Sequence, residues 1–174
     1  LLSSIYAALA SPLIEDSAQE RVRLLKLAIA GLKRDSHDMV HRYRALAIAF
    51  LSVGDSVGAE STLKDLELYC NTSQDLQQLE DVRASVFMNQ GNFKEAARCL
   101  LNRQFFWSTP GGVSNNLAVC VEQLGDLKQA RENQRVALKE AKATGSLFLQ
   151  VVSLSNLGAM ETKLGNLRAG ERFF

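Results

Sequence analysis

The chain has 174 residues, and its 20 basic and 19 acidic side chains leave a formal net charge of +1. A charge so close to balance excludes the long-range field that recruits nucleic acid or an anionic membrane surface. An apolar fraction of 47% with only 2 prolines is typical of a soluble, helix-rich protein, because Leu and Ala enter helices at little cost.

Targeting signals are not evident in the sequence: there is no signal peptide and no apolar run long enough to cross a bilayer, so we expect an intracellular protein of the cytoplasm or the nucleus. Leu1 is not an initiator methionine and the chain stops at Phe174, which indicates a fragment of a longer protein. Three widely spaced cysteines, Cys70, Cys99 and Cys120, match neither a disulfide framework nor a zinc motif. We expect them to be buried, reduced thiols.

The first part of the chain is predicted to form one helical hairpin that lacks a turn glycine. Its first helix is expected over Ile5–Ala10, followed by a turn at Ser11 and Pro12 and a second helix over Ser17–Lys33. That second helix has an apolar face, formed by Leu24, Leu25, Ala28 and Leu32.

Two histidines follow, His37 and His41, and their spacing of four residues would place them on one face of a helix. Such a pair could chelate zinc, but no third ligand is evident nearby. Asp38 between them also lacks the reach of the Glu found in metalloprotease helices. We therefore expect a solvated helix face and no metal site.

From Arg42 onward a unit of helix, tight turn and second helix recurs at intervals of 34 to 40 residues. The first helices of the units are predicted over Arg42–Ser52, Leu79–Gln90, Val113–Leu124 and Val151–Leu164. The second helices are predicted over Val57–Tyr69, Phe93–Arg103 and Leu127–Ala143. The repetition is clearest between Ser114–Ala130 and Leu154–Gly170, which share Asn-Leu-small and Leu-Gly-(Asp/Asn)-Leu.

Each turn contains a glycine, which can end a helix in the left-handed conformation without a Cβ penalty. A short polar residue that could cap the second helix follows each glycine. The glycines and their capping partners are Gly54-Asp55, Gly91-Asn92, Gly125-Asp126 and Gly165-Asn166. Small residues mark where two helices must approach closely, five positions after the first three glycines: Ala59, Ala96 and Ala130.

An aromatic segment, Phe105–Gly112, reads as the connection between two repeats. Its aromatic side chains, including Trp107, would either lie in the core beneath the connection or form an exposed docking patch.

The pattern resembles the tetratricopeptide repeat, in which a small residue lies in the first helix, Gly at the turn and Ala early in the second helix. The small residues here are Ala47, Ala84, Ala118 and Gly158. The longer spacings look like those of kinesin light chain, Pins-type adaptors and MalT-type regulators, and Asn115–Ala118 is most similar to the kinesin light chain version. Ser56, Gly170 and the missing first-helix tryptophan depart from the family pattern.

The resemblance implies an all-α fold, a right-handed superhelical solenoid of antiparallel helix-turn-helix repeats. We expect a single solenoid over residues 1–174, with repeats at 1–36, 37–74, 75–110, 111–148 and an incomplete one at 149–174. In the family, the first helices line a concave groove that binds extended peptides or helices of partner proteins. The groove positions carried over to this sequence that we select as binding candidates are Asn116, Asn156, Asn115, Glu122, Ser155, Thr162, Met88 and Arg44.

Asn116 and Asn156 fall at equivalent positions one repeat apart, and a side-chain amide both donates and accepts hydrogen bonds. They could bond to the backbone of a bound peptide, or tie their own helices to a neighbouring turn. The family's clamp for a carboxylate terminus is not expected, because Val152 and Ile48 occupy positions where it needs polar or basic groups.

Three functional hypotheses follow. The leading one is a protein-interaction scaffold or adaptor, with other proteins or peptide segments as partners and association through the open solenoid ends also conceivable. The alternative is a ligand-sensing or autoinhibitory module of a larger, MalT-type transcriptional regulator. An RNA-binding helical repeat is disfavoured by the near-neutral charge. No nucleophile, general base or cofactor loop stands out, so we expect neither an enzyme nor a cofactor.

Overall fold

The computed structural model describes residues 18–32, 38–104 and 112–173, and every regular element within those ranges is a helix. The chain divides into two compact units, residues 1–91 and 92–174, which we call unit 1 and unit 2. Each unit is described by itself. The predicted helix over Ile5–Ala10 and the aromatic segment around Trp107 lie outside the described residues.

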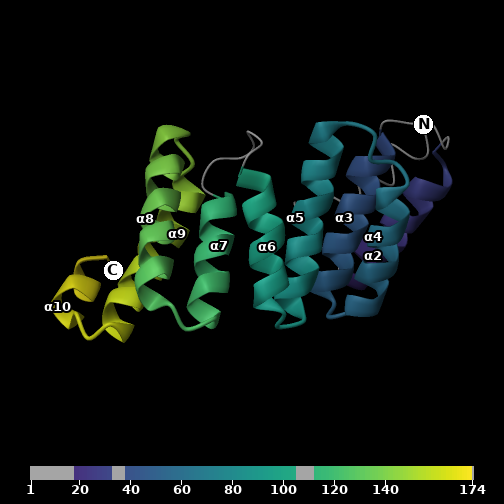
Figure 1. The fold of residues 1–174 in the computed structure, drawn as a ribbon. Helices are drawn as coiled ribbons and strands as arrows, with labels where there is room; N and C mark the ends of the chain where they lie inside the picture. Colours follow the sequence, from purple (N-terminus) through teal and green to yellow (C-terminus); the bar gives the residue numbers. More distant parts are fainter. Residues whose placement is uncertain (1–17, 33–37, 105–111, 174) are drawn as a thin grey trace. The chain divides into compact units, whose positions relative to one another are not determined.

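The described part of unit 1 consists of four helices, three of which pack on the fourth (Figure 1). Its helices are α2 (Ala18–Ala30), α3 (Asp38–Ser52), α4 (Ser56–Glu67) and α5 (Ser73–Asn89). Helix α3 contacts the other three, so it forms the centre of the unit.

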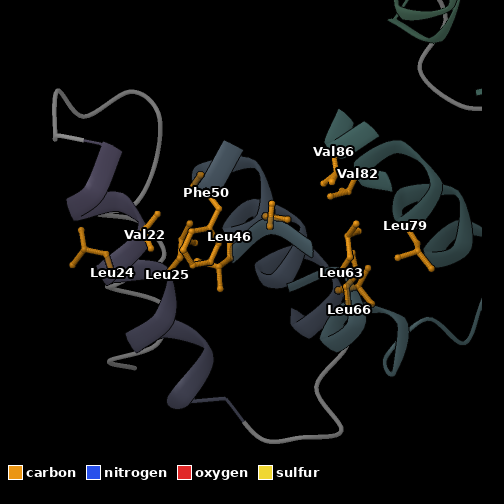
Figure 2. Packing of buried hydrophobic residues seen from close by; sticks show 14 residues of the cluster. Val22, Leu24, Leu25, Leu46, Phe50, Leu63, Leu66, Leu79, Val82 and Val86 are labelled. Carbon is orange, nitrogen blue, oxygen red and sulfur yellow. The ribbon is translucent and has the colours of Figure 1, made fainter. Parts of the chain in front are cut away.

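The interior of unit 1 is a continuous apolar cluster drawn from α2, α3, α4 and α5. Leu66 is completely buried, and Leu46 and Phe50 lie beside Val22 and Leu25 of α2 (Figure 2). Large aliphatic and aromatic side chains fill the space between the helices, so burial of apolar area is the main force that stabilises this unit.

Within its described residues, unit 2 contains four helices in an antiparallel succession, followed by two short elements. Its elements are α6 (Phe93–Gln104), α7 (Gly112–Gln123), α8 (Leu127–Ala143), α9 (Leu147–Lys163), the short α10 (Leu167–Gly170) and a 3-10 turn, η1 (Glu171–Phe173). Helix α7 packs on α6 and α8, and α9 packs on α8 and α10.

Small residues as well as Leu117 and Leu157 are buried among α7, α8 and α9. Ala118, Ala130, Ala137 and Ala141 have no exposed surface at all, and Met160 packs against the first two. Small side chains let helix backbones approach closely, which confirms the close-packing prediction for Ala130.

The predicted turn glycines are confirmed. Gly54, Gly91, Gly125 and Gly165 have φ angles of 76°, 74°, 94° and 83°, in the region that favours glycine. A fifth, Gly145, has φ 70° and ends α8. It was not anticipated because no capping Asp or Asn follows it.

The predicted caps are confirmed at three turns and wrong at one. Asn92 Oδ1 accepts a hydrogen bond from Glu95 N at 3.5 Å. Asp55 and Asp126 accept hydrogen bonds from Gly58 N at 2.7 Å and Gln129 N at 2.9 Å. Asn166 makes no capping hydrogen bond. Its amide nitrogen instead donates to the Glu161 carboxylate at 2.8 Å, because a buried charge nearby competes for it.

Several helices begin before the predicted residue. Helix α5 starts six residues early, because Thr72 and Asp75 form a reciprocal capping box. Helix α9 starts four residues early, where the Ser146 hydroxyl accepts from Leu149 N at 3.4 Å. Neither cap matches the Gly-(Asp/Asn) pattern of the other turns, because Thr72 follows no turn glycine and the residue after Gly145 is a serine.

Gly170 stands where the family has Ala, and the packing explains it. A Cβ atom at this position would lie 2.6 Å from Thr162 Oγ1 and 3.1 Å from the Gly158 carbonyl oxygen. The end of α10 therefore approaches α9 more closely than an alanine allows.

The three cysteines are free thiols; Cys99 and Cys120 are buried and Cys70 is half-buried. Burial raises the pKa of the Cys120 thiol to about 11. Burial, together with the Asp75 and Glu67 carboxylates, raises the pKa of Cys70 to about 11 as well. Both thiols are therefore protonated and poorly nucleophilic at neutral pH.

Candidate functional site

The structure brings six of the eight candidate residues together in unit 2. Helix α7 contributes Asn115, Asn116 and Glu122, and helix α9 contributes Ser155, Asn156 and Thr162. The other two, Arg44 and Met88, belong to unit 1. We call the surface formed by the six unit 2 residues the α7–α9 face.

Three helices meet at one side-chain oxygen on this face. Asn115 Oδ1 accepts hydrogen bonds from Gln134 Nε2 and from Asn156 Nδ2, both at 3.0 Å. Asn115 Nδ2 in turn donates to Asn116 Oδ1 at 3.4 Å. We call these four residues the amide cluster. Two of its three bonds run between helices, whereas the sequence analysis considered bonds to a bound peptide or to a neighbouring turn.

Gln134 is the member of the amide cluster that sequence reasoning missed. It lies on α8, has no exposed surface, and its Oε1 atom has no hydrogen-bond partner. The signal was present, because Gln134 interrupts the buried stripe of Ala130, Ala137 and Ala141 at helical spacing. A polar residue on such a stripe needs an internal partner, and Asn115 supplies one.

A second tie joins α7 and α9 near their ends, where Lys163 Nζ bonds to the Glu122 carboxylate. Both this pair and Asn115–Asn156 connect residues that are 41 positions apart. The two ties are separated by seven residues, or about two helical turns, on each helix. They therefore hold the same face of α9 against the same face of α7.

Glu161 is a second residue of this region that was not among the candidates predicted from the sequence. Glu161 lies four residues before its turn glycine, and the other repeats have Phe50, Phe87 and Val121 at the equivalent position. Glu161 is buried and lies 3.6 and 3.7 Å from the guanidinium groups of two α8 arginines, Arg131 and Arg135. The Glu161 carboxylate therefore links α9 to α8 through ion pairs.

The α7–α9 face also offers accessible surface. Ser155, Ala159 and Thr162 are exposed along one side of α9 at helical spacing. The Thr162 hydroxyl donates to the Gly158 carbonyl oxygen at 2.9 Å, so it is bonded within its own helix. The half-buried amide cluster and these exposed small residues together form a surface with hydrogen-bonding capacity and little bulk.

The two candidate residues of unit 1 lie on different helices. Arg44 and Met88 are half-buried on α3 and α5, and Ile48 is 47% exposed on the same side of α3 as Arg44. His41 is exposed on α3, and His37 lies outside the described residues. Within the described ranges, no three His, Cys, Asp or Glu side chains gather as a metal site would require.

The described helices were also compared with the requirements for crossing a bilayer. None of them combines the length and the apolar character that a membrane span needs.

Comparison of the sequence with protein-family models found no match, and comparison with curated proteins also found none. Solved structures do match the fold. MamA from Desulfovibrio magneticus RS-1 is 16% identical with a TM-score of 0.66, and the match covers 99% of this chain and 90% of that one.

Two further similar structures are described by their repeats. A putative kinesin light chain from Podosopora anserina with nearly identical TPR-like repeats is 15% identical, with a TM-score of 0.67 over 99% of this chain and 89% of that one. A STAND ATPase with a tetratricopeptide repeat sensor from Pyrococcus horikoshii is 19% identical, with a TM-score of 0.74 over 90% of this chain and 25% of that one. The chain therefore has the all-α, helical-repeat fold of tetratricopeptide-repeat proteins.

Proposed function

We propose that this chain is a protein-interaction scaffold and that the α7–α9 face of unit 2 binds an extended segment of a partner protein. The observation that carries the proposal is the juxtaposition of a half-buried amide cluster with exposed small residues on α9. Side-chain amides can bond to a peptide backbone whatever its side chains are. Ser155 and Ala159 leave room for such a backbone beside them.

Electrostatics add to the chemistry of this surface. The Glu122–Lys163 pair is neutral as a whole, so the face attracts neither strongly acidic nor strongly basic segments. Recognition on this face would rest on hydrogen bonds and shape, which suits a polar segment in extended conformation.

The sharpest test blocks the face without disturbing the amide cluster. Ala159→Arg places a long charged side chain on the exposed side of α9, and both residues are strong helix formers. Ala143→Arg is the matched control, because Ala143 is exposed on α8. The immobilised wild-type chain and both variants would be exposed to the same cell extract, and captured proteins identified by mass spectrometry.

The proposal expects proteins captured by wild type and Ala143→Arg to be lost on Ala159→Arg. Thermal unfolding of the three proteins verifies that both variants are folded. Equal capture by all three would show that the α7–α9 face is not the binding surface.

A regulatory module is the second candidate, and one observation favours it. The STAND protein carries its tetratricopeptide repeats as a sensor, and this chain matches only 25% of that protein. On this alternative the α7–α9 face binds a small ligand. A ligand that raises the melting temperature of wild type and Ala143→Arg, but not of Ala159→Arg, would support it.

A further inference from the structure

Unit 1 contains a pocket of about 560 Å³ that lies between α2, α3 and α4. This volume is within the range of pockets that hold small ligands or single side chains of a partner. The pocket belongs to one unit, so its lining is set by contacts among these three helices. None of the eight candidate residues lines it.

The pocket and the predicted groove positions occupy different sides of α3. Tyr43, Leu46 and Phe50 line the pocket, whereas Arg44 and Ile48 are groove positions. At 3.6 residues per turn, the two sets point in directions roughly half a turn apart. The pocket is therefore a surface separate from the one that the family resemblance suggests.

Part of the pocket lining is apolar. Leu46 and Phe50 line the pocket and also belong to the unit 1 cluster (Figure 2), and Ile29 of α2 and Val57 of α4 line it as well. Val57 is 78% exposed, which is unusual for a large aliphatic residue beside a pocket. An apolar side chain that enters here would bury the exposed surface of Val57.

The rim of the pocket is charged, and the charges are separated by helix. On α2, the Lys26 ammonium lies 5.0 Å from the centroid of the Phe50 ring, a cation–π contact. On the α4 side, Asp55 and Asp65 contribute two carboxylates. The three charges sum to −1, in a chain whose net charge is +1, so the rim is a local site of negative potential.

The spacing of the two carboxylates defines the partner. Asp55 and Asp65 are ten residues apart along α4, or about 15 Å on its axis. An extended peptide advances about 3.3 Å per residue and directs alternate side chains to one face. Two basic residues four positions apart would span about 13 Å and place the residue midway between them on the same face.

We propose that this pocket is a second docking site, for an extended protein segment in which an apolar residue lies between two basic residues at alternate positions. The apolar side chain enters between Ile29 and Val57, and the flanking basic side chains pair with Asp55 and Asp65. The site acts independently of the α7–α9 face, because it lies wholly within unit 1.

The direct probe is a capped peptide of sequence Gly-Arg-Ser-Leu-Ser-Arg-Gly, titrated into the full chain at millimolar concentration. Backbone amide chemical shifts, measured by NMR, report where it binds. We expect shifts confined to the residues of α2, α3 and α4 that line the pocket. Two matched peptides, with the Leu replaced by Ser or with both Arg replaced by Glu, should produce weak shifts or none.

Variants of the chain test the same contacts from the other side. Asp65→Lys reverses an exposed charge and should weaken binding roughly threefold to tenfold, because one surface ion pair is lost and the new positive charge repels the basic side chain of the peptide. Val57→Ser should weaken it by a similar factor, whereas Val136→Ser, on an exposed position of α8 in unit 2, should leave it unchanged. Asp55 is left intact because it caps α4.

Two results would overturn the proposal. One is the absence of shifts in the pocket amides with the Leu peptide. The other is equal shifts with the Leu and Ser peptides, which would mean that charge alone attracts the peptide and that the pocket takes no side chain.

Discussion

The two units share one hairpin pattern but have different interiors. Unit 1 packs large apolar residues such as Leu66 and Phe50 between its helices. Unit 2 also buries large apolar residues such as Leu157 and Met160. Between α7, α8 and α9, however, it adds fully buried alanines and buried polar side chains that include Gln134, Ser153 and Glu161. The turn glycines and the early alanine are the same in both.

This difference shows what the repeat pattern specifies and what it leaves open. Glycine at the turn and a small residue in each helix set how the helices approach one another. What fills the remaining space is free to vary. Apolar filling in unit 1 stabilises without direction, whereas polar filling in unit 2 fixes side-chain orientations through hydrogen bonds.

The largest effect is expected in the apolar interior of unit 1. Leu66→Ala should lower the free energy of unfolding by about 2–5 kcal/mol, because it opens a cavity at a fully buried position. Leu68→Ala, two residues away and 76% exposed, should change it by less than about 0.5 kcal/mol. Urea unfolding measures both, and equal losses would contradict the apolar core assigned to this unit.

An intermediate effect is expected in the amide cluster of unit 2. Asn115→Ala removes the oxygen that accepts from both Gln134 and Asn156 and should lower the free energy of unfolding by about 1–3 kcal/mol. Asn156→Ala removes one donor and leaves the Gln134 bond in place, so its loss should be about 0.5–1.5 kcal/mol. Urea unfolding of both variants and of the double variant tests this order. Losses that simply add would show that the two residues are not coupled.

The smallest effect is expected in the pH dependence of stability, which depends on one thiol in each unit. The pKa of Cys120 is raised from its usual 9.0 to about 11, so its protonated form stabilises the fold below pH 9, and that contribution is lost as the pH rises toward 11. Cys70 should behave in the same direction. The stability of wild type should therefore fall more steeply between pH 9 and pH 11 than that of Cys120→Ala. Parallel curves for the two proteins would contradict this prediction.

Much of the fold could be predicted from the sequence, because it depends on local chemistry. Turn glycines and close-approach alanines are visible at fixed offsets, and α8 has the predicted bounds of Leu127–Ala143. The starts of α5 and α9 were not predicted because their caps, Thr72 and Ser146, are not the Asp or Asn that follows the glycine at the other turns.

The candidate site could be predicted only in part. Asn116 and Asn156 were identified because they recur at repeat spacing, and Asn115 because the family resemblance places it at a groove position. Their partner Gln134 was not, because a hydrogen bond between α7 and α8 depends on side-chain geometry in three dimensions. The unit 1 pocket depends on three helices at once, and no short stretch of sequence contains it.

The two ties between α7 and α9 have a consequence for how such a chain can change. Because both span 41 residues and lie about two turns apart, sliding α9 by one turn along α7 would break both at once. A deletion or insertion within α8 would do the same, since it moves every α9 side chain relative to α7. Substitutions on the outer surface leave this alignment intact, so the length of the repeat is constrained more strongly than its surface residues.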